Sequence, residues 1–126
     1  DFRQLEQLHA LKTGALIKAA VLAGAILSNA TADQIRFLEI YSDNIGFAFQ
    51  VTDDILNVEG NPNLMGKRVG TDETRQKSTL PAMLGIDVSR KLARDLVGNA
   101  LNSLESFGRE SDPLRAVATY IIQRKR

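Results

Sequence analysis

Two adjacent carboxylates, Asp53 and Asp54, stand in a segment whose other residues are almost all apolar. An ionised carboxylate that leaves water must be paired, hydrogen-bonded or bound to a metal, or its pKa shifts until it is neutral. The chain has no cysteine and a single histidine, His9, so a metal ion would be held by oxygen ligands. Such ligands suit a hard cation such as magnesium better than zinc. The pair therefore predicts a magnesium site, and a solvated surface stripe is the alternative interpretation.

Helical periodicity gathers further polar residues around this pair. At about 100° per residue, the polar and small residues of the segment fall within roughly a quarter turn of a helix. They are Asp43, Gly46, Gln50, Asp53, Asp54 and Asn57. The remaining arc is apolar and consists of Ile45, Phe47, Ala48, Phe49, Val51, Ile55 and Leu56. The pattern predicts a largely buried helix whose single polar stripe faces a cleft or solvent.

The composition indicates a globular chain whose net charge is too small to create a strong electrostatic field. Its 126 residues fit one domain or part of a larger one. Sixteen basic and fifteen acidic residues give a formal net charge of +1, which does not favour nucleic acid or an anionic membrane as a partner. The most apolar stretch, 14–27, contains Lys18 and is short for a bilayer, so no stable membrane insertion is expected. No signal-peptide pattern opens the sequence, and a cytoplasmic location is the default expectation.

The first half of the chain predicts two long helices. Residues 2 to about 28 are rich in helix formers, and Lys12-Thr13-Gly14 is expected to be a kink or a junction between two helical pieces. The run Thr31-Ala32-Asp33-Gln34 has the form of a capping box. It should open a helix that continues to about Val58 and carries the aspartate pair.

A long connection follows, from Glu59 to Pro81, in which the apolar period disappears. Connections of this length are uncommon in compact domains and are usually functional or disordered. This one carries the basic residues Lys67, Arg68, Arg75 and Lys77, which indicate an anion-binding role. Asp72 is ambiguous, because it could orient a metal-bound water or pair locally with a basic neighbour.

The last third of the chain predicts further helices and no strand. Helical character returns near Pro81 and again from Asp87 to about Phe107, before Gly108 ends it. The predicted core-facing stripe of this helix is Val88, Leu92, Leu96, Leu101 and Leu104. The final helix should start at Asp112 as N-cap, with Pro113 as first helical residue, and reach the basic end Arg124-Lys125-Arg126. These terminal cations suit a helix C-terminus.

A magnesium ion on the aspartate pair would give the basic residues a shared ligand. Magnesium keeps several waters, binds one or two carboxylates and completes its shell with phosphate oxygens. Diphosphate is the natural candidate for a polyanion that also meets Lys12, Lys67 and Lys77. Thr13 could donate a further hydrogen bond. Each signal has a plainer interpretation, because loop lysines are often merely solvated and a Lys-Thr pair at a helix junction can be a cap.

Several ordered motifs across nearly the whole chain resemble those of a known family. They are HALKTGALI at 9–17, GFAFQVTDDIL at 46–56, GKRVGTD at 66–72, KSTLP at 77–81 and YIIQR at 120–124. The chain resembles the C-terminal part of a trans-prenyltransferase of the polyprenyl synthetase family, and within it the bacterial farnesyl diphosphate synthases (geranyltranstransferases). The resemblance implies an all-α, mostly antiparallel helical bundle of the isoprenoid-synthase type. Residues 1–126 would be the C-terminal portion of a single such domain.

The resemblance also implies a role for each matching residue. Lys12 and Thr13 would contact the allylic substrate, and Gln50 would help to stabilise the allylic cation. Asp53 and Asp54 match the start of the second aspartate-rich motif, which holds Mg²⁺. Lys67 and Lys77 match diphosphate-binding lysines. The implied reaction ionises dimethylallyl or geranyl diphosphate and joins the cation to isopentenyl diphosphate; after loss of a proton, the products are farnesyl diphosphate and diphosphate.

Two departures from the family pattern qualify these expectations. Asn57 stands where the second motif usually has a third aspartate, and an amide keeps an oxygen ligand but loses a charge. The first aspartate-rich motif and its helix do not occur in these residues, so the chain alone is expected to be inactive. The family implies a homodimer. The remaining alternatives are a longer-chain polyprenyl diphosphate synthase, a related terpene-forming enzyme, and a non-catalytic helical partner of a prenyltransferase.

Overall fold

The described part of the chain is almost entirely helical. The computed structural model describes residues 2–60 and 79–125. Its helices are α1 Phe2–Leu27, α2 Ala32–Gly60, α5 Leu80–Leu84, α6 Ile86–Ser103 and α7 Asp112–Gln123. Within these two ranges there is no strand, as the all-α expectation requires. One prediction is wrong: α1 continues through Lys12-Thr13-Gly14 without a break, because the helix formers on both sides outweigh one glycine.

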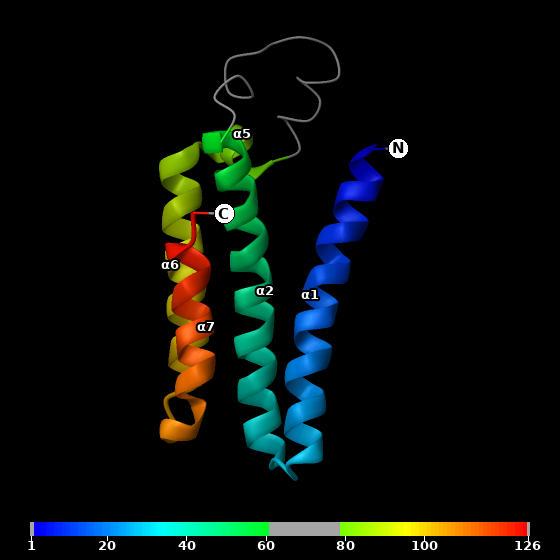
Figure 1. Cartoon of the computed structure of the whole chain (residues 1–126), viewed down its shortest axis with the longest axis vertical. Coiled ribbons are helices and arrows are strands. Elements are labelled where there is room, and N and C mark those ends of the chain that lie inside the picture. The colour runs from blue at the N-terminus through cyan, green and yellow to red at the C-terminus, as the bar shows by residue number, and fades with distance from the viewer. Residues whose placement is uncertain (1, 61–78, 126) are drawn as a thin grey trace.

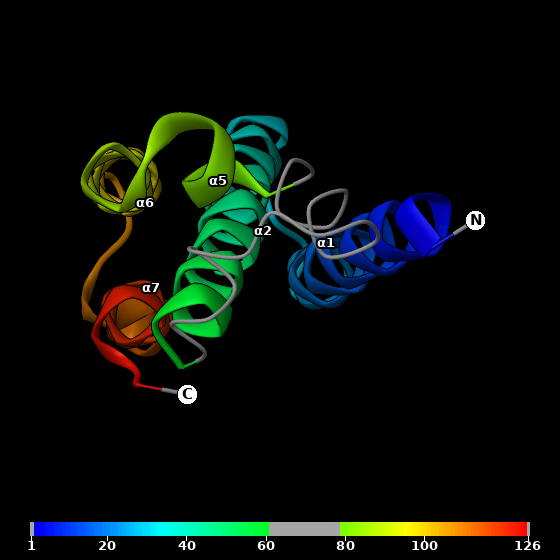
Figure 2. The ribbon, with the colours of Figure 1, turned by 90° about the horizontal axis from the view of Figure 1, so that it is seen from above.

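The four long helices run alternately up and down (Figure 1). Seen along their axes, α2 lies in the middle, with α1 on one side and α6 and α7 on the other (Figure 2). The most extensive packing is between α2 and α6, followed by α1 against α2. The central helix α2, which carries the aspartate pair, is therefore fixed from both sides.

The start of α2 is set locally by its sequence. The N–H of Thr31 donates to Oε1 of Gln34 at 2.9 Å, and the N–H of Gln34 donates to Oγ1 of Thr31 at 3.1 Å. This reciprocal pair is the predicted capping box and is confirmed. It fixes where α2 begins and so which of its residues face α6.

The buried faces differ in detail from the predicted stripes. On α6 the core face is Ser89, Ala93, Val97 and Ala100, followed by Leu104 in the turn after the helix. The predicted stripe is wrong at Val88, which is 53% exposed. The small residues Ala93 and Ala100 lie at the centre of this buried face, whereas Leu92, Leu96 and Leu101 lie at its edge and are only partly buried. On α2, Phe47 was expected to be buried but is 46% exposed, because it lies on the α1 flank and outside the face packed against α6 and α7.

Arg115 fixes the turn between α6 and α7. Its guanidinium donates to the main-chain oxygens of Leu104 at 2.8 Å, Phe107 at 3.1 Å and Gly108 at 3.2 Å. It also donates to Oδ1 of Asp112 at 2.8 Å. These bonds satisfy carbonyl groups that the end of α6 leaves without helical partners. Asp112 is therefore the first residue of α7 and not its N-cap, which is Ser111.

Tyr41 joins α2 to α7, and its ionisation makes the stability of the fold depend on pH in the alkaline range. The phenol is fully buried and donates to the main-chain oxygen of Leu114 at 2.8 Å. Burial raises the pKa of Tyr41 from 10.0 to about 12. The unfolded chain loses this proton at lower pH than the folded chain. The stability that the protonated, buried phenol contributes is therefore complete below pH 10 and is lost as the pH rises toward 12. We expect the free energy of unfolding to fall by about 2–3 kcal/mol across this window.

Urea unfolding at several pH values measures this dependence. Tyr41→Phe should lower the free energy of unfolding by about 1 kcal/mol at neutral pH, since the hydrogen bond is lost. It should also remove the alkaline component, which is the further fall in the free energy of unfolding between pH 10 and 12. The matched control is Tyr120→Phe, because that ring lies on the surface, and the alkaline component should persist in it. An unchanged alkaline component in Tyr41→Phe contradicts the prediction.

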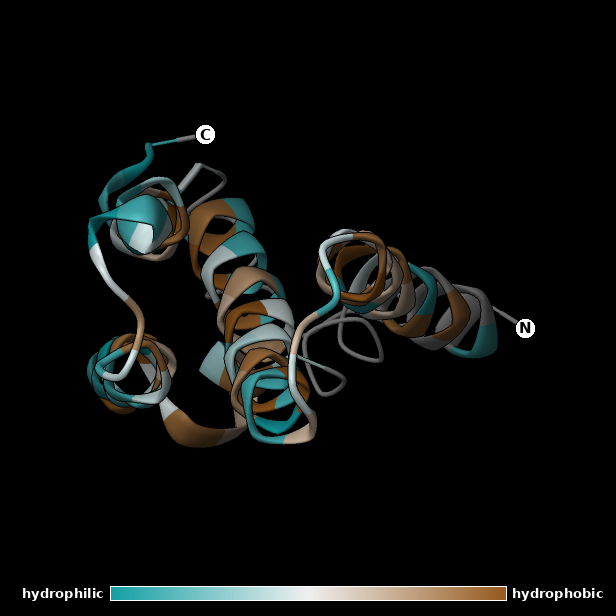
Figure 3. Cartoon of the chain, turned by 90° about the horizontal axis from the view of Figure 1, so that it is seen from below, coloured by the Kyte–Doolittle hydropathy of each residue, from teal (hydrophilic) through white to brown (hydrophobic). Residues whose placement is uncertain are grey.

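Helix α1 is covered on one side only within the described part of the chain. Hydrophobic residues recur along its whole length (Figure 3), and Leu8, Leu11 and Leu16 are exposed. None of the described helices combines the length and hydrophobicity that crossing a membrane requires.

Candidate functional site

The aspartate pair lies in the C-terminal half of α2. Nε2 of Gln50 donates to Oδ1 of Asp54 at 3.2 Å across one helical turn, so these two predicted site residues are in contact. Asp53 and Asp54 are both partly exposed, whereas Val51 and Ile55 beside them are buried in the core with Ala93. The helix thus presents both carboxylates at the border between core and solvent.

Asp53 forms an ion pair with the end of the chain. Nη2 of Arg124 donates to Oδ1 of Asp53 at 2.5 Å, and the same nitrogen donates to the main-chain oxygen of Phe49 at 3.2 Å. The guanidinium carbon lies 4.3 Å from the centroid of the Phe49 ring, which is cation–π geometry. Arg124 follows the last residue of α7, and its N–H donates to the oxygen of Tyr120 at 2.9 Å. The C-terminal residues and the aspartate motif therefore form one site.

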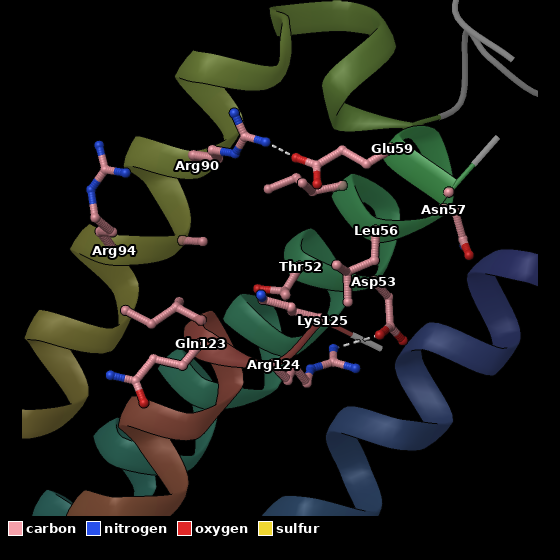
Figure 4. A pocket seen from close by; sticks show the side chains of 14 residues that line it. Thr52, Asp53, Leu56, Asn57, Glu59, Arg90, Arg94, Gln123, Arg124 and Lys125 are labelled. Carbon is pink, nitrogen blue, oxygen red and sulfur yellow. Dashed lines mark hydrogen bonds and ion pairs between the residues drawn. The ribbon is translucent and has the colours of Figure 1, made fainter. Parts of the chain in front are cut away.

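A cavity of about 1030 Å³ opens beside this ion pair, between the end of α2, the start of α6 and the end of α7 (Figure 4). Its charged lining residues are Asp53, Glu59, Arg90, Arg94, Arg124 and Lys125. Arg90 is paired with Glu59 across the cavity. Four cations and two anions give this lining a net charge of +2. An anion is therefore favoured in the cavity.

A second hollow, of about 560 Å³, lies between α1 and α2. Leu11 and Gly14 line it from α1, and Gly46, Phe47 and Gln50 line it from α2. A side-chain carbon built on Gly46 would lie 3.4 Å from Cα of Gly14, so the two backbones approach closely here. At the far end, Nζ of Lys18 pairs with Oδ1 of Asp43 at 3.2 Å. The hollow is mostly apolar and has polar residues at both ends.

The backbone brings Lys12 and Thr13 close to the level of Gln50. The two helices are antiparallel and meet at Gly14 and Gly46, so residues just before Gly14 lie opposite those just after Gly46 (Figure 1). Leu11 and Gln50 accordingly share one hollow. Lys12 is exposed and Thr13 is partly buried. Lys67, Arg68, Asp72, Arg75 and Lys77 lie outside the described residues.

The donor set fits a hard divalent cation. Asp53 and Asp54 supply carboxylate oxygens, and the exposed amide of Asn57 follows one turn later on the same helix. Oδ1 of Asp53 already holds a cation, the guanidinium of Arg124. Among the described residues no three acidic, histidine or cysteine side chains gather into a group that could hold a metal ion. Magnesium commonly binds proteins through one or two carboxylates, with waters and substrate phosphate in its other positions.

Sequence reasoning missed the part that Arg124 plays in this site. The pattern placed the basic end Arg124-Lys125-Arg126 at a helix C-terminus, and Arg124 does cap α7. Nothing in the local sequence shows that its side chain crosses to a residue 71 positions earlier. The available signal was indirect: a basic run follows the last helix, and a carboxylate pair in an apolar helix needs a cation.

The chain is similar to known proteins over most of its length. Residues 1–116 match the family profile described as polyprenyl synthetase. The farnesyl diphosphate synthase of Escherichia coli (strain K12) is 46% identical over 126 residues, which covers 97% of the chain and 42% of that relative. The geranylgeranyl diphosphate synthase of Cyanophora paradoxa is 42% identical over 95% of the chain and 40% of the relative.

A solved structure has the same fold. It comes from Marinomonas sp. MED121 and is assigned as a farnesyl-diphosphate synthase. Its TM-score is 0.71 at 39% identity, and the match covers 94% of this chain and 39% of that one. The chain therefore spans about two fifths of the length of the proteins that it matches.

Proposed function

The chain belongs to the polyprenyl synthetase family, and we propose that residues 1–126 are the C-terminal portion of a synthase domain that carries out prenyl transfer. The substrates are an allylic diphosphate, dimethylallyl or geranyl, and isopentenyl diphosphate, and the products are farnesyl diphosphate and diphosphate. The observation that carries this proposal is the 46% identity to a farnesyl diphosphate synthase over 97% of the chain.

In this proposal some residues of the chain supply charge for metal and diphosphate binding, and others orient the allylic substrate. Asp53 and Asp54 hold a magnesium ion, which, when bound, neutralises charge on the departing diphosphate. Gln50, fixed by its bond to Asp54, directs its amide oxygen toward the allylic cation. Lys12 binds the diphosphate from α1 and Thr13 contacts the allylic substrate beside it. Preorganised charges of this kind supply much of the rate enhancement when charge develops in a transition state.

Other expectations of the resemblance stay predictions. Lys67 and Lys77 are assigned to diphosphate binding, and both lie outside the described residues. A homodimer and a cytoplasmic location rest on the family and on the sequence. A longer product is the second candidate function, because a geranylgeranyl diphosphate synthase is 42% identical to the chain.

Complementation tests the proposal. The chain is coexpressed with the N-terminal part of the Escherichia coli farnesyl diphosphate synthase that precedes its matching segment, and prenyl transfer is measured with radiolabelled isopentenyl diphosphate. We expect the pair to be active and each part alone to be inactive. Chromatography of the products distinguishes farnesyl from longer chains. A stable complex of the two parts without turnover contradicts the proposal and favours the non-catalytic partner.

A further inference from the structure

The contacts of Arg124 leave half of the Asp53 carboxylate open. One nitrogen, Nη2, donates both to Oδ1 of Asp53 and to the main-chain oxygen of Phe49. Because Phe49 and Asp53 are four residues apart on α2, the guanidinium bridges one helical turn. Within residues 2–60 and 79–125, no hydrogen bond reaches Oδ2 of Asp53. Among the described residues, the carboxylate is thus held by one oxygen and has no hydrogen-bond partner at the other.

Burial separates the two members of this pair. The side chain of Arg124 is 9% exposed, whereas that of Asp53 is 38% exposed. The guanidinium is also stacked on the Phe49 ring and tied to the end of α7. Arg124 is therefore a fixed part of the fold, and the free edge of Asp53 is the part that a ligand can reach.

The buried position of Arg124 carries a cost. Its Nε is buried and has no hydrogen-bond partner among the described residues. An apolar side chain would fill the same space against Phe49 without leaving a polar atom unpaired. Packing alone therefore does not account for an arginine here, whereas control of the carboxylate does.

We propose that Arg124 is a positioning residue for metal binding at Asp53: it fixes the rotamer of the carboxylate so that Oδ2 is presented to the ion. The inference rests on the proposed function, which places the metal on Asp53 and Asp54. Carboxylates that ligate metals are generally oriented by hydrogen bonds from groups that do not touch the ion. The charge of Arg124 repels the metal, but the proposal holds that the fixed carboxylate outweighs this repulsion, so that Arg124 strengthens metal binding.

Mn²⁺ binding to the full chain and to the complemented synthase is the test, with free Mn²⁺ measured by electron paramagnetic resonance. We expect Arg124→Gln to weaken binding about 10- to 100-fold. Arg124→Lys should recover only part of the loss, because a lysine keeps the charge but has no planar guanidinium to stack on the Phe49 ring. Lys125→Gln is the matched control, as it removes an exposed cation from the same cavity, and it should change binding less than about twofold.

Two further measurements keep the outcomes distinct. Asp53→Asn should remove Mn²⁺ binding, and if it does not, the metal site of the proposed function is wrong. If Asp53→Asn removes binding while Arg124→Gln binds Mn²⁺ as tightly as the unmodified chain or more tightly, only the positioning role is wrong. In the complemented synthase, Arg124→Gln should raise the Mg²⁺ concentration at half-maximal rate and recover at high Mg²⁺. A lower rate at every Mg²⁺ concentration, with unchanged half-saturation, overturns the proposal.

Discussion

Asp53→Ala in the complemented synthase is expected to abolish measurable prenyl transfer, a loss of at least about 10³-fold. The change removes a carboxylate that the proposal assigns to the metal, and it also leaves the guanidinium of Arg124, 9% exposed, without its counter-charge. The rate is measured at saturating concentrations of both diphosphates, and circular dichroism reports whether the helices remain.

The comparison variant is Asn57→Asp, on the same helix. It restores the third aspartate of the family motif at an exposed position, and we expect the rate to change by less than about threefold, because exposed charges interact weakly. A folded Asp53→Ala protein with a near-normal rate refutes the metal assignment. If Asn57→Asp lowers the rate as much as Asp53→Ala does, then any change of charge in the motif is harmful. The rate loss in Asp53→Ala would then not identify Asp53 as a metal ligand.

Leu104→Ala is expected to lower the free energy of unfolding by about 2–5 kcal/mol. Leu104 is fully buried where α6 ends, in the core cluster that contains Val97, Ala118 and Ile121. Truncation removes apolar contacts from this cluster and leaves a cavity. The backbone cannot easily close that cavity, because the guanidinium of Arg115 holds the main-chain oxygen of Leu104 at 2.8 Å. Since small domains have a total stability of about 5–15 kcal/mol, this is a large share.

Urea unfolding measures this effect, and Leu16→Ala is its control. Leu16 is 62% exposed on α1, so the same deletion there should stay within about 0.5 kcal/mol. Equal losses at both positions contradict the prediction. They indicate instead that the face of α1 that carries Leu16 is covered in solution.

Local sequence signals predicted the helices well where the determining contacts are also local. The capping box at Thr31 and Gln34 involves residues three positions apart, and its two hydrogen bonds follow from the side chains alone. Period 3.6 likewise placed Gln50 and Asp54 on one face, and they are bonded. At Phe47 and Val88 the same reasoning failed, because an apolar residue on a helix flank is buried only if another helix reaches it.

The sequence by itself determined the helical class of this protein, the position of its carboxylate pair within a helix and the family to which it belongs. Only the tertiary structure decided that Arg124 holds Asp53 and that α6 meets α2 through alanines. The physical reason is the sequence separation of the residues that interact. Periodicity and capping depend on residues within a few positions, whereas the partner of a buried charge depends on which distant segment packs beside it, here one 71 residues away.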